Sequence, residues 1–154
     1  MNLTFGPDTA MAVAGVGVGL LIACVQFWFG ARHERFVNTL RIIDRLEDRE
    51  MLSIRHRVDD IMEAAKAQGY VFEKLSDEDR AALSSVAKLF GLVGVLAQRK
   101  SIDTTIVYRG WARNICATCE RMGPYFEWRL GLPGGRALIK DFKWLARKVR
   151  RYYH

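Results

Sequence analysis

Residues Ala10 to Phe29 place the strongest restriction on what this chain can fold into. These twenty residues carry no charged side chain and only one amide, Gln26. At about 1.5 Å rise per residue, a helix of this length spans roughly 30 Å, the thickness of the hydrocarbon core of a bilayer. A helix also satisfies its backbone hydrogen bonds internally, as a lipid environment requires. The block therefore predicts a transmembrane helix over residues 10–29.

The flanks of this block favour a retained anchor and give it a direction. A cleaved signal peptide has a basic segment before a shorter apolar core, but residues 1–9 contain no Lys or Arg. The twenty residues after the block contain five arginines, beginning with Arg32 and Arg35. By the positive-inside rule we expect residues 1–9 outside and the C-terminal part in the cytoplasm, with Trp28, Arg32 and Arg35 as the interfacial anchor.

Small residues recur at a spacing of four within the block, at Gly15, Gly19 and Ala23. Such residues fall on one helix face and let a second membrane helix approach closely. The pattern suggests contact with another membrane subunit, or self-association. The alternative, that glycine is simply frequent in membrane helices, remains open.

The rest of the chain predicts helices and no sheet, since no stretch alternates with period two for long enough to form a strand. A long stalk helix is expected over 30–68, because this stretch after Gly30 contains no Gly or Pro. Apolar residues recur in it at spacings near three and four, beginning with Phe36, Leu40 and Ile43, and are expected to form its one apolar face. A helical domain follows over 76–130, in which Ser76 and Asp103 are suited to cap helices. A glycine- and proline-rich break precedes a tail helix over 136–154. The predicted fold class is all-α.

The tail holds most of the formal net charge of +7, since it contains seven basic residues and one acid, Asp141. Its apolar residues recur at intervals of four and three: Leu138, Phe142, Leu145, Val149 and Tyr152. Such a helix can lie on an anionic leaflet, or pack its stripe on the domain or on a partner helix. Both interpretations stay open. Binding to nucleic acid is not expected, because the positive charge of the tail is the only feature that would favour it. The residues expected to contact the membrane surface or a partner are Lys140, Lys143, Trp144, Arg147, Lys148, Arg150 and Arg151.

One pair of residues suggests chemistry, the CxxC of Cys116 and Cys119. A redox pair needs an activated thiolate, usually at a helix N-terminus after a strand, but this pair lies deep in a predicted helix. A structural metal site needs about four ligands, and none of the three histidines has ligand spacing to the pair. We therefore favour simple packing of both cysteines, and we expect no catalytic residue, cofactor or metal.

The stretch 89–129 carries a familiar pattern: a helix with a glycine-containing apolar end, a basic residue, Ile-Asp, Val-Tyr, an aromatic, and later Pro with an aromatic-Arg pair. The positions are Phe90, Gly94, Ile102, Asp103, Val107, Tyr108, Trp111, Pro124 and Arg129. This pattern resembles the DUF4760 group of bacterial proteins, although the run from Gly91 to Gly94 stands where an acidic residue is expected after the Phe. The resemblance implies a small helical protein, often with an N-terminal membrane helix, and no particular chemistry.

These observations predict a non-enzymatic, single-pass membrane protein, an adaptor or accessory subunit of a larger membrane-associated assembly, in a bacterial inner membrane. The expected partners are the lipids of an anionic leaflet and other membrane subunits. Two alternatives remain: a membrane-bound redox or metal protein that uses Cys116 and Cys119, and an effector that perturbs its own membrane.

Overall fold

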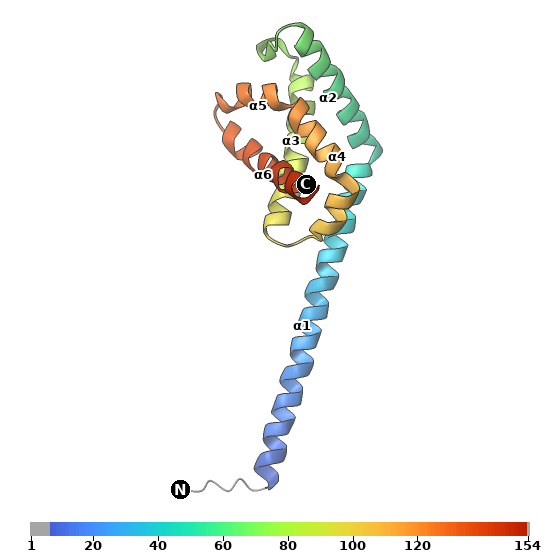
Figure 1. Ribbon diagram of the computed structural model, residues 1–154, viewed down its shortest axis with the longest axis vertical. Coiled ribbons are helices and arrows are strands. Elements are labelled where there is room, and N and C mark those ends of the chain that lie inside the picture. The colour runs from blue at the N-terminus through green and yellow to red at the C-terminus, as the bar shows by residue number, and fades with distance from the viewer. Residues whose placement is uncertain (1–6, 154) are drawn as a thin grey trace.

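The computed structural model describes residues 7–153, apart from the side chains of residues 7–15, 137, 138 and 153. This part of the chain forms helices and no strand, which confirms the all-α fold class. In chain order (Figure 1) the elements are α1 (Pro7–Glu47), α2 (Arg49–Ala67), the 3-10 helix η1 (Phe72–Lys74), α3 (Asp77–Gln98), α4 (Thr104–Arg121), α5 (Gly123–Leu130) and α6 (Gly135–Tyr153).

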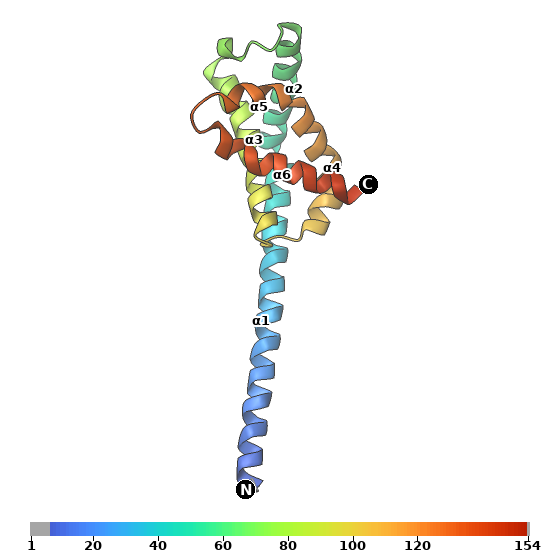
Figure 2. The same ribbon diagram turned by 60° about the vertical axis from the view of Figure 1, so that its left-hand side comes forward.

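Helix α1 divides into a free half and a packed half. Its N-terminal half projects alone from the domain in both side views (Figures 1 and 2). Every side chain from Val16 to Gly30 is exposed, including Phe27 and Phe29. This helix is long and apolar enough to cross a membrane, and so is α3. The two differ in packing, because half of the apolar window of α3 is buried inside the domain.

The helix expected over 30–68 is interrupted at Asp48. The backbone of Asp48 leaves the helical region, with ψ of 134°, and the chain changes direction there (Figure 1). The buried residues of α1 are Thr39, Ile42 and Leu46, whereas those of α2 are Val58, Ile61, Met62 and Ala65. At 3.6 residues per turn, these two stripes would lie about a third of a turn apart on one straight helix. The break at Asp48 therefore lets both stripes face the domain.

The sequence pattern also predicted the wrong buried face for α1. Phe36 and Leu40 belong to the spacing that we expected to form the apolar face, yet both are exposed. The buried face instead contains a polar residue, Thr39, which is fully buried. A hydrogen-bonded threonine can be buried at little cost, because its hydroxyl is satisfied in the folded chain.

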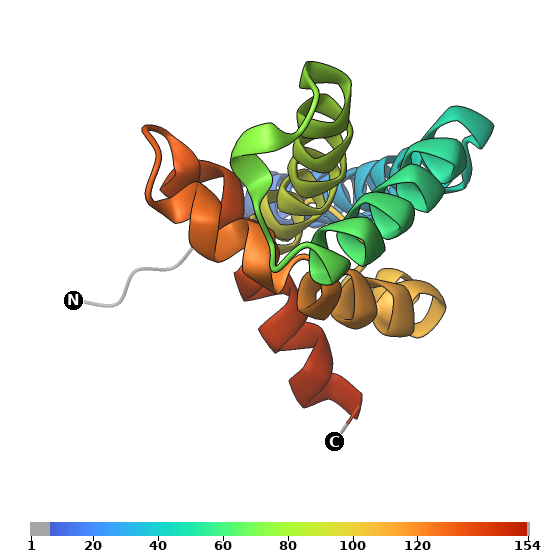
Figure 3. The ribbon, with the colours of Figure 1, turned by 90° about the horizontal axis from the view of Figure 1, so that it is seen from above.

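Helix α3 is the centre of the domain. It packs against α2 and, most extensively, against α6, which crosses it at a steep angle (Figure 2). Seen from above (Figure 3), α2 and α4 lie side by side. Phe90 of α3 stacks on Phe142 of α6 with ring centroids 4.9 Å apart. A Cβ at Gly94 would collide with the backbone carbonyl of Asp141, so glycine permits this crossing.

Two predicted helix starts are confirmed in detail. The Ser76 hydroxyl accepts a hydrogen bond from the backbone N–H of Asp79 and donates one to the Asp79 carboxylate. The Asp103 carboxylate accepts from the backbone N–H groups of Thr105 and Ile106. Each cap satisfies N–H groups that have no partner in the first turn of a helix, which fixes where α3 and α4 begin.

Candidate functional site

The packed half of α1 is joined to the domain by hydrogen bonds at the α3–α4 loop. The hydroxyl of Thr39 accepts a hydrogen bond of 2.7 Å from the backbone N–H of Asp103 and donates one to the Arg35 carbonyl. The side-chain amide of Asn38 donates to the Ser101 carbonyl. Ile102, between these two positions, is buried. The loop therefore fixes the height and rotation of the domain on α1.

A wide groove lies directly below this junction, where α1 leaves the domain. It has a volume of about 1020 Å³ and is lined by residues from α1, the end of α3, the α3–α4 loop, α4 and α6. Figures 1 and 2 both show the α3–α4 loop at the lower end of the domain, beside α1. We call this feature the basal groove and define it by Trp28, Arg32, Arg35, Lys100, Asp103, Tyr108, Trp144 and Lys148.

The basal groove brings together residues from three separately predicted sets. The interfacial set of Trp28, Arg32 and Arg35 lines it from α1. The family-like motif contributes three residues, and the tail contributes Trp144 and Lys148. The motif residues are Ile102, Asp103 and Tyr108. The three sets are far apart in the sequence, so only the packing of α1 and α6 on the domain makes them neighbours.

The groove is electropositive, because its cations have no acidic partners. Arg32, Arg35, Lys100 and Lys148 form no ion pair with any residue that the structure describes. The one carboxylate in the lining, that of Asp103, is used to cap α4. The Arg32 guanidinium lies 5.4 Å from the centroid of the Trp28 ring, a cation–π contact that leaves its charge in place.

Two basic residues of the tail that lie outside the groove form ion pairs with acids of the domain. Lys143 forms an ion pair of 2.8 Å with Glu127, and Arg150 pairs with Glu120. These contacts hold α6 on α5 and α4. The remaining cations of the predicted set, Lys140, Arg147 and Arg151, are exposed and lie outside the groove.

The apolar stripe of the tail packs on the domain, which decides between the two interpretations of its sequence. Phe142, Leu145 and Val149 are fully buried, together with Ile139, whereas Tyr152 is half exposed against Tyr108. Leu138 lies outside the side chains that the structure describes. The stripe is therefore not free to insert into a leaflet, and any contact of α6 with lipid must come from its charged side and from Trp144.

The predicted contact face of the apolar block stays open within this chain. A Cβ at Gly19 would meet nothing within 4 Å, and Ala23 is exposed. The surroundings of Gly15 lie outside the described residues. No other part of the domain covers this face where it is described.

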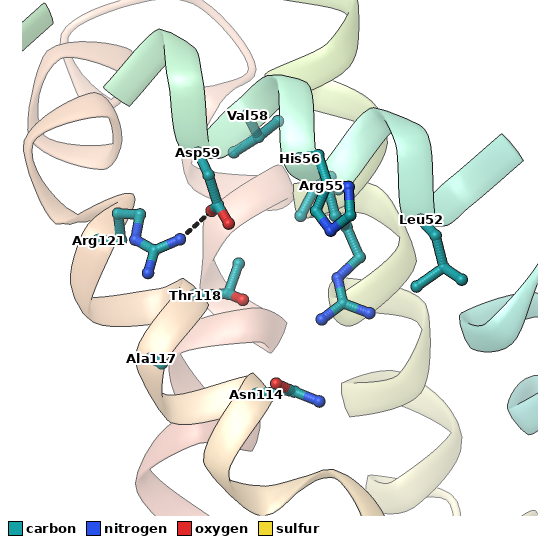
Figure 4. A pocket seen from close by; sticks show the side chains of 10 residues that line it. Leu52, Arg55, His56, Val58, Asp59, Asn114, Ala117, Thr118 and Arg121 are labelled. Atoms are coloured by element: carbon teal, nitrogen blue, oxygen red, sulfur yellow. Dashed lines mark ion pairs between the residues drawn. The ribbon is translucent and has the colours of Figure 1, made fainter. Parts of the chain in front are cut away.

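A second pocket, between α2 and α4, was not anticipated from the sequence (Figure 4). Its volume is about 250 Å³, and its lining includes Arg55, His56, Asp59, Asn114 and Arg121. An ion pair joins Asp59 to Arg121 across the pocket, as the dashed line in Figure 4 marks.

The remaining charge of this pocket is Arg55, whose guanidinium lies 5.0 Å from the centroid of the Trp111 ring. Burial lowers the pKa of Arg55, although the charge of Asp59 opposes that shift. The charged groups are thus turned toward each other and toward Trp111, so the pocket is a polar seam between α2 and α4. No local sequence signal links residues this far apart along the chain.

The two cysteines of the CxxC lie half-buried between α4 and α6. The Cys116 thiol contacts the Ala146 carbonyl at 3.8 Å, and burial raises the pKa of the Cys119 thiol, against the charge of Lys143. A reactive thiolate needs a lowered pKa. The described residues contain no group of three or more His, Cys, Asp or Glu side chains arranged to hold a metal ion. Both observations favour the packing interpretation.

The other family-like residues serve the architecture rather than one site. Phe90 lies in the core against Phe142, and Trp111 is buried beneath Arg55. Pro124 stands in the first turn of α5, and Arg129 donates to the Pro133 carbonyl, which closes the loop before α6. These residues therefore contribute to helix packing, to the start of α5 and to the loop between α5 and α6.

Residues 11–149 match the family model described as Domain of unknown function (DUF4760). The match covers most of the chain, from the apolar block into α6. No curated protein and no solved structure matches the chain.

Proposed function

The chain belongs to the DUF4760 family, and we propose that this member is a non-enzymatic single-pass membrane protein that acts as an adaptor or accessory subunit of a larger membrane assembly. Its apolar block crosses the bilayer with residues 1–9 outside. Its helical domain stands in the cytoplasm, directly at the membrane surface. It is anchored in a bacterial inner membrane.

One observation carries this proposal: α1 runs without interruption from the exposed apolar block into the buried contact of Thr39 with Asp103. A flexible linker would allow the distance between the domain and the membrane anchor to vary, whereas one continuous helix keeps that distance constant. From Phe29 to Thr39, ten residues of helix place that contact about 15 Å beyond the apolar block. The domain therefore presents one constant face to the bilayer.

The second apolar helix, α3, stays in the domain under this proposal. Leu83, Val86 and Phe90 are completely buried against other helices. Moving α3 into lipid would expose the apolar surfaces of α2 and α6 to water, at about 25 cal/mol for each Å² exposed. The burial of α3 supports its assignment as a core helix, and under this proposal α1 is the single membrane span.

Membrane insertion and direction are tested together. We expect the full chain to remain in the membrane pellet after alkaline carbonate extraction. A reporter that functions only in the cytoplasm should be active when fused to the C-terminus and inactive when fused to the N-terminus. A chain released by carbonate, or reporters with the opposite activities, would overturn the proposal.

The adaptor role depends on the face of α1 that contains Gly19 and Ala23. Replacing both residues by Leu would block the close approach of a second helix. Gly17→Leu is the matched control, because two residues rotate a helix by about 200° and place Gly17 on the opposite face. Neither Gly17 nor Gly19 has a neighbour within 4 Å, so a larger side chain collides with nothing inside the chain.

The measurement is the mass of the complex purified from native membranes in mild detergent. We expect the chain to elute with other subunits, or with a second copy, and the G19L/A23L variant to lose this association while G17L keeps it. A monomer that elutes alone for the unaltered chain would remove the support for an assembly.

A further inference from the structure

The basal groove has a lining that is both basic and apolar. Its four unpaired cations come from α1, the α3–α4 loop and α6. Exposed aromatic side chains of α1 stand beside them, with Trp28, Phe29 and Phe36 each about half exposed or more. A surface that joins positive charge to exposed aromatic rings suits a ligand with an anionic head and an apolar body.

The groove also begins at the end of the apolar block. Its lining on α1 starts at Trp28 and extends to Phe36, a helix length of about 12 Å. The headgroup layer on each side of a bilayer is roughly 5–8 Å thick. If the block spans the hydrocarbon core, the lower part of the groove is level with lipid phosphates and the upper part lies just above them.

We infer that the basal groove binds the headgroup of an anionic phospholipid from the leaflet that surrounds α1. The phosphate is held by Arg32, Lys100 and Lys148, and the acyl chains lie along the exposed apolar surface of α1 below Phe29. This inference rests on the proposed membrane insertion and names one partner of the same protein. Such a lipid would also link α6 to α1, since Lys148 and Arg32 would share one phosphate.

A lipid fits these observations better than a free anion does. A soluble phosphate or carboxylate would use only the cations of the groove. A lipid headgroup can also contact the exposed aromatic side chains that line the groove beside those cations, Trp28 and Phe29.

Two substitutions remove two of the four positive charges of the groove without disturbing the fold. Lys100 has a positive φ of 55°, a backbone conformation that favours glycine, so Lys100→Gly relieves strain at that turn. Lys148 is exposed, so Lys148→Gln is expected to be neutral for stability. The matched control is K140Q/R147Q, which also removes two positive charges, but from exposed positions of α6 outside the groove.

The experiment counts lipids bound to the full chain, purified in nonionic detergent and titrated with phosphatidylglycerol or phosphatidylcholine, by native mass spectrometry. We expect one saturable phosphatidylglycerol and no comparable phosphatidylcholine. Each basic residue near an anionic surface is worth roughly fivefold in affinity. The K100G/K148Q variant should therefore bind phosphatidylglycerol about thirtyfold more weakly, and K140Q/R147Q within about threefold of the unaltered chain.

Three outcomes would overturn the inference. Equal losses in both double variants would mean that general charge attracts the lipid. No loss in K100G/K148Q would mean that the lipid binds elsewhere. Full competition by millimolar inorganic phosphate would make the ligand a free anion. Because binding is measured in detergent, these results are separate from the carbonate and reporter tests: a chain that inserts but shows no lipid preference keeps the proposed function and loses this site.

Discussion

The hydroxyl of Thr39, near the end of α1, accepts a hydrogen bond from the backbone N–H of Asp103, which in turn caps α4 with its carboxylate. Thr39 is fully buried and lies 64 residues from Asp103 in the sequence. Together with the hydrogen bond from Asn38 to Ser101, this contact joins the long helix to the loop that starts the second half of the domain. Its position makes it the contact on which the orientation of the domain depends.

Replacing Thr39 by Val is expected to lower the free energy of unfolding by about 1–3 kcal/mol. Valine fills the same volume but leaves the N–H of Asp103, which makes this partly buried hydrogen bond, without its acceptor. Amide hydrogen exchange at Asp103 should accelerate in this variant and stay slow in Thr39→Ser, which keeps the hydroxyl. Equal protection of the amide in both variants would show that this hydrogen bond does not hold the junction.

Two glycine substitutions should act in opposite directions. Gly94→Ala forces a Cβ against the Asp141 carbonyl and pushes α3 and α6 apart, so we expect a loss of at least about 1–3 kcal/mol. Gly110→Ala lies in the middle of α4 with nothing within 4 Å, and should stabilise the chain by about 0.5–1 kcal/mol through helix propensity. Chemical unfolding of the two variants in detergent compares them directly, and a shared sign would contradict the described α3–α6 crossing.

The packing of the tail predicts a large effect at Phe142. Its ring is buried between those of Phe90 and Phe126, so Phe142→Ala should cost about 3–5 kcal/mol. The exposed neighbour Lys140 serves as control, and Lys140→Ala should change stability by less than about 0.5 kcal/mol. If Phe142→Ala instead weakened vesicle binding and left unfolding unchanged, the stripe would face lipid.

The raised pKa of Cys119 predicts slow alkylation near neutral pH. Burial favours the neutral thiol, so the rate should climb only at pH values above the usual range for cysteine, and unfolding should abolish the difference. The stability supplied by this group is complete below about pH 8.5, the unfolded pKa, and is lost as pH rises through the folded value. The measurement is mass spectrometry of time-resolved iodoacetamide labelling, and rapid labelling at pH 7 would revive the redox interpretation.

The ion pair of Asp59 with Arg121 is expected to contribute little, despite its place in the pocket of Figure 4. Both side chains are nearly half exposed, and pairs in such settings are worth about 0.2–1 kcal/mol. A double-mutant cycle with D59A and R121A measures this coupling. A coupling above about 2 kcal/mol would mean that the seam between α2 and α4 is shielded from solvent.

Much of the local structure was predictable, because it depends on neighbouring residues. Ser76 and Asp103 stand at the caps that their side chains favour, and α3 ends at Gln98 where the apolar period ends. The break at Asp48 was not predictable in the same way. No Gly or Pro marks it, and its cause is the mismatch between the buried stripes of α1 and α2, which is a property of the assembled domain.

For the residues of the candidate site, too, the sequence predicted individual roles but not which residues lie together. Trp28 and Arg32 were predicted as interfacial anchors and Lys148 as a residue that contacts the membrane surface or a partner, but nothing in the sequence indicated that they line one groove. The pairing of Lys143 and Arg150 with acids of α5 and α4, which separates them from Lys148, likewise became visible only in the folded chain.

The sequence by itself determined that the chain is helical, that one uncharged segment is long enough to cross a membrane, and where most helices begin. Those properties follow from hydropathy, periodicity and capping, which act over a few residues. The tertiary structure alone decided which face of α1 is buried, that the tail stripe belongs to the core, and which cations remain unpaired. These depend on contacts between residues far apart in the chain, such as Thr39 with Asp103, whose geometry is set by how all the helices pack at once.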